Sequence, residues 1–403
     1  MQLQITWSPE SAAPLAFAAG ELRRYLAQML PQEGGPLEIS LAAEGEGTAP
    51  ERFSVHMTAE GGAISGSGPR AALLGGYDYL RRLGCRFLGP GEGWEKVPAI
   101  DRSRLAADYE KTASFRHRGV CIEGADSLEN ILDFIDWLPK AGYNSFFLQF
   151  KLPYAFLERW YRHEKNPLLE PEAYTVDDAA RDTEVLEAAA KKRGLLLHRV
   201  GHGWTGEVLG YPALSWKPDE RPLEASKRPL AAQVDGVRGL RGGVPANTNL
   251  CYHSAQAVDA FASLVVDYAR SHPAADYLHI WLADEYNSVC ECAGCVKTTV
   301  SDQYAALLNE IDRRLTAEGL ETRLVFLLYQ ELLWPPVQER LRNPDRFVLM
   351  FAPISRTFEA SYCLEGAPRE IPPFARNRIT LPTDLGENLA FLRGWQKVFS
   401  GES

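Results

Sequence analysis

The chain of 403 residues lacks several features that would place it in a specialised class. It has no run of about 18 apolar residues, which a membrane-spanning helix would need. Residues 1–5 lack the basic start and apolar stretch of a signal peptide, so we expect a cytoplasmic protein from the sequence as given. Its seven cysteines are an odd number in a long chain, which does not suit a disulfide framework.

Positive charge is also in short supply. The 43 Lys and Arg residues against 53 Asp and Glu residues give a formal net charge of −10. A surface that neutralises phosphate backbones would carry the opposite excess, so we expect no nucleic acid and no membrane as a partner.

The hydrophobic content of 45% is ordinary for a globular protein, and the length exceeds what one core usually supports. We therefore expect two domains.

The first 112 residues predict a small α/β layer. Apolar periodicity predicts strands over 2–7, 37–41, 53–57 and 63–66, and helices over 16–29 and 69–83. Gly84 follows the second helix, as a C-terminal cap should. A polar segment over 101–112 then separates this layer from the rest of the chain. We place the domain boundary between residues 112 and 113, with the second domain extending to residue 403.

From residue 113 onward, short apolar strands alternate with helices. The predicted strands are 119–123, 145–150, 195–200, 278–282, 324–329 and 347–351, and the predicted helices are 128–141, 183–193, 255–271, 301–318, 337–342 and 387–399. This alternation indicates a parallel sheet of the (β/α) barrel type. A closed barrel needs eight strands, so we expect either an open six-stranded sheet or, preferably, a barrel truncated after about six units.

Two adjacent acids, Asp284 and Glu285, follow the fourth of these strands, where (β/α) barrels carry their reactive groups. Neighbouring carboxylates are costly to desolvate unless they have solvent, a partner or a chemical role. In one interpretation Glu285 is a general acid, protonated through partial burial and repulsion from Asp284. In the other, both acids are solvated and only cap the next turn. The position at the strand end leaves both interpretations open.

Other candidate contacts gather at the same ends of the strands. His202 follows the third strand and has a glycine on each side, which suits a tight loop that presents its side chain. Trp204 offers a flat apolar face to a sugar ring. Glu123 ends the first strand and is a candidate for binding hydroxyl groups. Asn287, just beyond the acidic pair, is a further candidate substrate contact.

A loop with three cysteines, Cys290, Cys292 and Cys295, comes directly after the acidic pair. Their spacing is compatible with zinc, but a structural zinc site takes four ligands. Cys251 or His253 could supply the fourth. The alternative is three reduced thiols that pack the loop. We expect no required cofactor, and a structural zinc would serve to rigidify the loop that carries Glu285.

Several of these stretches resemble known families. Residues 64–70, 76–80 and 83–87 are similar to the small α/β domain that precedes the barrel in β-hexosaminidases and α-glucuronidases. The acidic pair followed by Cys-x-Cys-x-x-Cys resembles the bacterial family called domain of unknown function 4838, which overlaps glycoside hydrolase family 163. The resemblance implies a glycoside hydrolase that cleaves β-linked N-acetylglucosamine, with an oligosaccharide or glycan as its substrate.

The similar glycoside hydrolase family 20 adds a mechanism. Its histidine after the third strand and its Asp-Glu pair after the fourth are matched here by His202, Asp284 and Glu285. The resemblance implies that Asp284 orients the substrate's 2-acetamido group, whose oxygen attacks the anomeric carbon, while Glu285 protonates the leaving oxygen and later activates water. Residues 281–283 depart from the paired glycines of family 20. An α-glucuronidase-like hydrolase with a positively charged pocket and a non-catalytic carbohydrate-binding protein stay open as alternatives.

Overall fold

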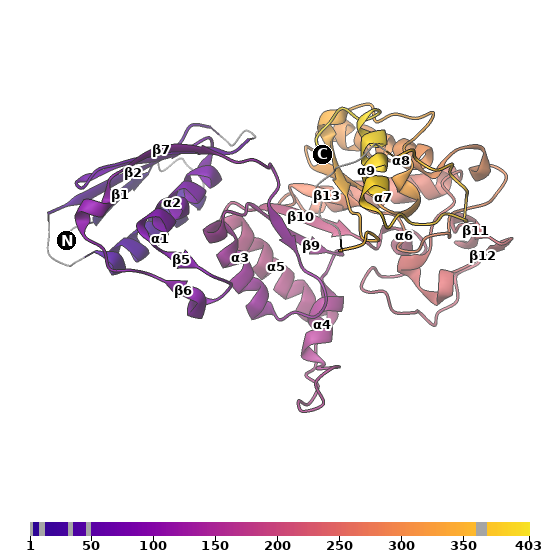
Figure 1. The fold of residues 1–403 in the computed structure, drawn as a ribbon. Helices are drawn as coiled ribbons and strands as arrows, with labels where there is room; N and C mark the ends of the chain where they lie inside the picture. The colour runs from indigo at the N-terminus through magenta and orange to yellow at the C-terminus, as the bar shows by residue number, and fades with distance from the viewer. Residues whose placement is uncertain (1–2, 8–12, 31–34, 46–49, 360–368) are drawn as a thin grey trace. The chain divides into compact units, whose positions relative to one another are not determined.

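The computed structural model describes residues 3–7, 13–30, 35–45, 50–359 and 369–403 (Figure 1). The chain forms two compact units. The first contains Met1–Leu148 and Phe156–Leu197, and the second contains Gln149–Ala155 and His198–Ser403. Within the described ranges, no helix is both long and apolar enough to cross a membrane.

A five-stranded sheet with two helices begins the first unit. The strands follow the order β1-β2-β4-β3-β7, with parallel pairs β1-β2 and β2-β4 and antiparallel pairs β3-β4 and β3-β7. Helices α1 and α2 cover one face of this sheet (Figure 1). The elements are β1 (Leu3–Trp7), α1 (Ala13–Met29), β2 (Leu37–Ala43), β3 (Arg52–Met57), β4 (Gly61–Gly66), α2 (Pro69–Leu83) and β7 (Ala107–Thr112).

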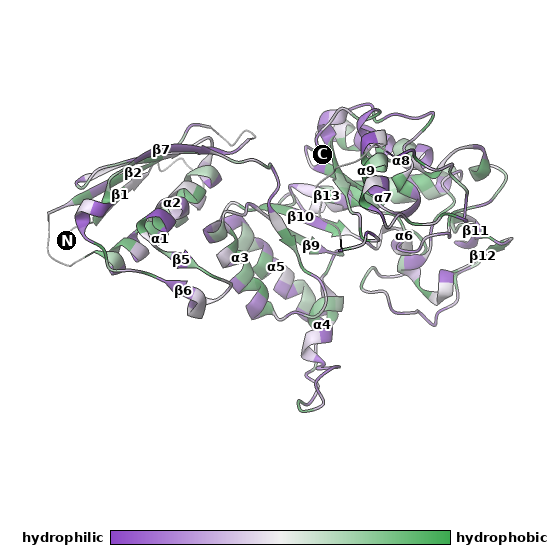
Figure 2. Cartoon of the chain, in the orientation of Figure 1, coloured by the Kyte–Doolittle hydropathy of each residue, from purple (hydrophilic) through white to green (hydrophobic). Residues whose placement is uncertain are grey.

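Local sequence signals explain where α2 begins and ends. Pro69 stands in its first turn, where a missing N–H costs nothing, and Gly84 ends it with a φ of 112°, a conformation that favours glycine. The apolar faces of α1 and α2 form the core of the layer with the sheet. Figure 2 shows hydrophobic and hydrophilic residues alternating around these helices, as a helix with one buried face requires.

One prediction for this region is wrong. The segment 101–112 was expected to be a polar separator, but its second half forms strand β7, which pairs with β3. The charged residues of β7 are exposed, and the strand lies at the edge of the sheet, where charge is tolerated and discourages further pairing.

The first unit continues past the small sheet. It holds the short antiparallel pair β5 (Arg86–Phe87) and β6 (Glu95–Lys96), and then the parallel pair of β8 (Gly119–Cys121) with β9, which spans Ser145–Gln149. Helices α3 (Leu128–Ala141), α4 (Tyr154–Tyr161) and α5 (Val176–Lys192) follow in this part of the chain. This compact unit extends beyond Thr112 and so does not end at the predicted boundary. The division between residues 112 and 113 remains a prediction about domains.

A parallel sheet in the order β10-β13-β14-β15 forms the centre of the second unit. Its core combines buried apolar residues of these strands with those of the helices that follow them. The elements are β10 (Leu196–Gly201), α6 (Trp204–Val208), β11 (Gln233–Val234), β12 (Val237–Arg238), α7 (Ala255–Ser271), β13 (Tyr277–Ile280), α8 (Val300–Ala317), β14 (Arg323–Leu328), β15 (Phe347–Phe351) and α9 (Leu385–Gln396).

The predicted helix over 337–342 does not form. The backbone N–H groups of Gln338 and Glu339 donate to Oδ1 of Asp302, at 2.7 and 2.9 Å, rather than to helical carbonyls. Two prolines directly precede this segment. The Asp302 carboxylate on α8 accepts hydrogen bonds from amides that a helix would otherwise use. The remaining strands and helices confirm the expected fold class. It is α/β, a small α/β layer followed by parallel strands and helices that alternate as in a (β/α) barrel.

Candidate active site

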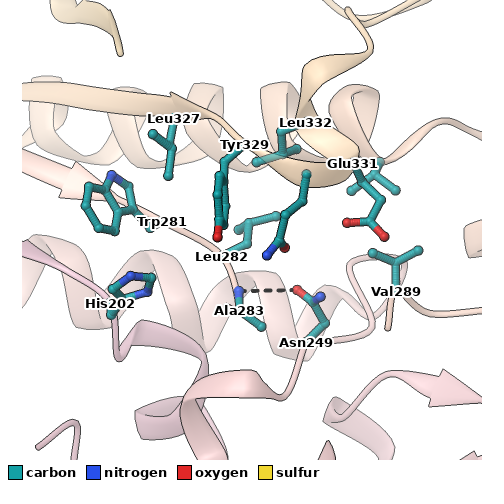
Figure 3. A pocket seen from close by; sticks show the side chains of 12 residues that line it. His202, Asn249, Trp281, Leu282, Ala283, Val289, Leu327, Tyr329, Glu331 and Leu332 are labelled. Carbon is teal, nitrogen blue, oxygen red and sulfur yellow. Dashed lines mark hydrogen bonds between the residues drawn. The ribbon is translucent and has the colours of Figure 1, made fainter. Parts of the chain in front are cut away.

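A small pocket opens where the chain leaves β10, β13 and β14 in the second unit (Figure 3). Its cavity volume is about 20 Å³, room for little more than a water molecule and far below the roughly 300–1,000 Å³ of ligand pockets. These three exits lie at the carboxyl ends of parallel strands, the edge at which (β/α) barrels bind ligands. The lining residues are His202, Asn249, Trp281, Leu282, Ala283, Val289, Val300, Leu327, Tyr329, Gln330, Glu331 and Leu332.

His202 and Asp284 are brought together beside this pocket. Nε2 of His202 lies 3.8 Å from Oδ2 of Asp284, which is too long for a hydrogen bond. Burial lowers the pKa of His202 to about 3, so its imidazole is neutral at neutral pH. The Asp284 side chain is 24% exposed, and its backbone N–H donates to the carbonyl of Ala246 at 3.0 Å. A neutral ring thus stands next to a partly solvated carboxyl group.

The phenol of Tyr329 responds to both acids. Burial raises its pKa most, the charge of Asp284 and a hydrogen bond to that carboxylate raise it further, and the charge of Glu285 adds to the effect. Tyr329 directly follows β14, and in Figure 3 its hydroxyl points toward Leu282 and Ala283. Asp284 and Glu285 are not among the described residues that line the pocket, but both raise the pKa of this tyrosine at its edge.

Glu331 places a third carboxyl group near this pocket. It is 4% exposed, and its Oε1 accepts a hydrogen bond of 2.6 Å from the backbone N–H of Asn287. Burial raises its pKa, and this effect exceeds the opposing hydrogen bond, while the charge of Glu285 raises the pKa further. The site is therefore rich in carboxyl groups, and the described residues that line the pocket include no Lys or Arg.

Side-chain hydrogen bonds fix the loop that carries the acids. Oδ1 of Asn249 accepts from the N–H of Ala283 at 3.4 Å (Figure 3). Its Nδ2 donates to Oγ of Ser288 at 3.3 Å. The Ser288 hydroxyl donates in turn to the carbonyl of Glu285 at 2.6 Å. One amide side chain thereby holds the loop on both sides of the acidic pair.

Asn287 has a different role from the expected one. Its backbone adopts a φ of 53°, which asparagine tolerates better than most residues. Its Oδ1 accepts from the N–H of Ile379 at 2.9 Å, and its Nδ2 donates to the Ile379 carbonyl at 3.2 Å. Both ends of the carboxamide are engaged by the chain, so Asn287 shapes the loop in place of the expected substrate contact.

The prediction that Trp204 presents a face to a sugar is also wrong. The side chain lies in α6 and is only 1% exposed. Its indole N–H donates to the carbonyl of His279 at 2.9 Å, and its ring contacts Phe261 and Tyr268. Trp204 is the first residue of α6, and this helix packs its first residue into the core. The side chain therefore points inward.

Glu123 lies outside this pocket's unit. It follows β8 in the first unit and is exposed. Its proposed contact with ligand hydroxyl groups stays a prediction.

The three cysteines of the loop are joined by a fourth. Cys251, Cys290, Cys292 and Cys295 place their sulfur atoms within 4.8 Å of one another. His253, the other expected partner, instead packs against Gly294, where an added Cβ would lie 2.0 Å from its ring. Cys363 lies outside the described residues.

The polar pocket residues that escaped sequence reasoning include Asn249, Tyr329 and Glu331. A signal existed for two of them, because Tyr329-Gln330-Glu331 directly follows an apolar strand, just as the acidic pair follows β13. Asn249 gave none, since it lies in a long irregular segment whose path depends on tertiary contacts.

No protein-family model matches the chain, and no curated protein sequence matches it. Among solved structures, a GH138 enzyme targeting pectin rhamnogalacturonan II has a TM-score of 0.52 at 12% identity, and the match covers 90% of this chain and 49% of that one. The chitobiase of Flavobacterium johnsoniae has a TM-score of 0.51 at 13% identity, with coverage of 89% and 52%. The chain thus spans about half the length of these glycoside hydrolase structures, and at such identities the likeness shows a shared fold.

Proposed function

We propose that this chain carries the catalytic pocket of a glycoside hydrolase that cleaves β-linked N-acetylglucosamine, with retention and with the substrate's own acetamido group as nucleophile. One observation supports this most directly: Asp284, which Glu285 follows, has its Oδ2 3.8 Å from Nε2 of the buried His202, just beyond the end of β13. Both acids follow β13 at the carboxyl end of a parallel strand, where (β/α) barrels carry their reactive groups, and a chitobiase has a similar fold.

Asp284 is assigned to the acetamido group. Its carboxylate accepts the amide N–H of the substrate, which makes the amide oxygen a better nucleophile and stabilises the oxazolinium cation that forms. The imidazole of His202 is neutral and so adds no positive charge beside this carboxylate. Burial and the neighbouring Asp284 raise the pKa of Tyr329, so its phenol stays protonated and is able to donate to this carboxylate.

Glu285 is assigned to proton transfer. As the amide oxygen bonds to the anomeric carbon and the glycosidic bond breaks, Glu285 gives its proton to the departing oxygen. It then accepts a proton from the water that attacks the same carbon and reopens the oxazolinium ring. Two displacements at one carbon retain its configuration. No second carboxylate is needed as the nucleophile at about 5 Å from the acid.

The composition of the pocket counts against an α-glucuronidase-like activity. A uronic acid carries a negative charge, which Arg or Lys side chains would bind. The described lining has neither, and Glu331 adds a further carboxyl group. A uronate would meet repulsion here.

Three aryl β-glycosides test the proposal in the complete protein: the N-acetylglucosaminide, the glucoside and the glucuronide. We expect hydrolysis of the N-acetylglucosaminide alone, because only this substrate carries the acetamido group. The Asp284→Asn variant should lose activity on it. Hydrolysis of the glucuronide, or oligosaccharide binding by calorimetry with no product after days, would overturn the proposal, the second outcome in favour of a carbohydrate-binding protein.

A further inference from the structure

Four cysteines from separate parts of the second unit converge on one point. Cys251 precedes α7, whereas Cys290, Cys292 and Cys295 lie in the loop after β13. Three of them are buried, and Cys292 is half-buried. The sulfur of Cys251 lies 3.6 Å from that of Cys292 and 3.8 Å from that of Cys295.

These separations fit a metal better than a disulfide. A disulfide would bring two sulfur atoms to about 2.05 Å. Four thiolates at about 2.3 Å from a tetrahedral zinc ion stand about 3.8 Å apart, because that is the edge of such a tetrahedron. From this match we propose that Cys251, Cys290, Cys292 and Cys295 bind a structural Zn²⁺ ion.

Hydrogen bonds to the sulfur atoms support thiolate ligands. The N–H of Gln233 donates to Sγ of Cys290 at 3.3 Å, and the N–H of Cys295 donates to Sγ of Cys292 at 3.5 Å. Such bonds orient ligands and stabilise their negative charge. Gly294 makes the turn between Cys292 and Cys295 possible, since any side chain there would collide with His253.

Two arginines offset the negative charge of four thiolates, which exceeds that of one divalent ion. Nη2 of Arg238 lies 3.9 Å from Sγ of Cys251. The guanidinium of Arg376 donates to the carbonyls of Cys290, Cys295 and Thr298, at 3.0, 2.8 and 2.6 Å. Two nearby guanidinium groups favour a cluster of negatively charged thiolates over a cluster of neutral thiols.

The metal is structural, because four protein ligands leave no open position for a substrate or water. Its effect on the pocket is positional. Cys251 is two residues from Asn249, and Cys290 is two residues from Ser288, and these two side chains are hydrogen-bonded to each other. Zinc thereby joins the segment with Asn249 to the segment with Ser288. The side chains of these two residues bind the backbone of Ala283 and Glu285.

The test is the metal content of the purified full-length protein, measured by elemental analysis after removal of loosely bound ions. We expect one zinc per chain, and a large loss of zinc in Cys251→Ser. The matched control is Cys121→Ser, because Cys121 is an exposed cysteine of the first unit and should leave the zinc content unchanged.

Cobalt substitution provides a readout that does not depend on activity. Cobalt bound by four thiolates in a tetrahedron has intense visible absorption, which we expect in the wild type and in Cys121→Ser. Chelation should lower the melting temperature of the wild type. A wild-type protein that folds without metal, keeps its melting temperature in chelator and shows no cobalt spectrum would overturn the proposal, even if Cys251→Ser fails to fold. Stoichiometric iron in place of zinc would also contradict it.

Discussion

Two buried glutamates, one in each unit, have opposite electrostatic surroundings. Glu51 is 7% exposed and is bound by the guanidinium groups of Arg70 and Arg118, with Nη2 of Arg118 at 2.6 Å, and by Nδ2 of Asn144 at 3.0 Å. Burial alone would raise its pKa, but the two arginines outweigh burial and the pKa is lowered. For Glu331, burial dominates and the pKa is raised.

The difference separates two uses of a buried carboxyl group. A carboxylate with two cations is committed to joining segments of chain, and Glu51 joins the small sheet to α2 and to the segment before β8. A buried carboxyl group without enough nearby cations to offset its desolvation has a raised pKa, as Glu331 does. Perturbed pKa values are frequent at functional sites. The comparison predicts that changes in the first cluster alter stability, whereas changes in the acidic pocket alter turnover.

The largest effect should come from Glu285→Gln. The variant keeps the shape of the side chain but cannot transfer a proton, so we expect turnover to fall by about 10²–10⁴-fold. Binding of an N-acetylglucosamine oligosaccharide, measured by calorimetry, should survive. Turnover within a factor of two of the wild type would show that Glu285 does not transfer the proton, and would contradict the predicted link between the acidic residues and turnover.

Glu51→Ala should be the most destabilising of these changes. It leaves two arginines and an amide without their shared acceptor in a buried setting, and breaking such a cluster costs about 3–5 kcal/mol of unfolding free energy. Denaturant unfolding measures this cost. The control is Glu44→Ala, whose exposed pair with Arg52 contributes about 1 kcal/mol or less. Turnover per folded molecule should not change in either variant.

Tyr329→Phe tests the hydroxyl group whose pKa both acids raise. Without it Asp284 loses one hydrogen bond to a charged group, so we expect kcat/KM to fall roughly tenfold with little change in unfolding free energy. Steady-state kinetics on the aryl N-acetylglucosaminide measure the loss. A variant that is destabilised but fully active would place Tyr329 with Glu51 as a structural residue.

The smallest effects should be opposite in sign between the two glutamates. Since the folded-state pKa of Glu51 is lowered, its contribution is complete above the ordinary value of 4.5 and is lost as pH falls through the folded-state pKa. Since that of Glu331 is raised, the folded state holds the proton longer and stability falls as pH rises through the interval above 4.5. Relative to wild type, Glu331→Gln should therefore gain stability from acid to neutral pH, and Glu51→Gln should lose it. Equal slopes in unfolding measured across this range would contradict the contrast.

Much of the fold could be predicted from local signals. Helices α2, α3 and α7 and strand β15 begin and end where apolar periodicity and caps place them. The failures share one cause, which is tertiary contact. The amides of 338 and 339 are bound by Asp302 on a distant helix, and β7 is a strand only because β3 offers it a partner.

The candidate site was predictable at its acidic centre and not at its walls. Asp284 and His202 follow strands that must end at one edge of a parallel sheet, so their proximity follows from the topology. The burial of Trp204 depends on α6 beginning at that residue, and the position of Asn249 depends on an irregular segment held by hydrogen bonds to other loops. Neither has a local pattern in the sequence.

The bonds of Asn287 to Ile379 also bear on the order of folding. The two residues are 92 positions apart, and Asn377 bonds to the carbonyl of Val289 across a comparable separation. Contacts between such distant residues form late, because a long loop must close first. During synthesis the acidic loop therefore leaves the ribosome well before the residues that complete its hydrogen bonds, and it acquires its final shape only after the segment around Ile379 has docked.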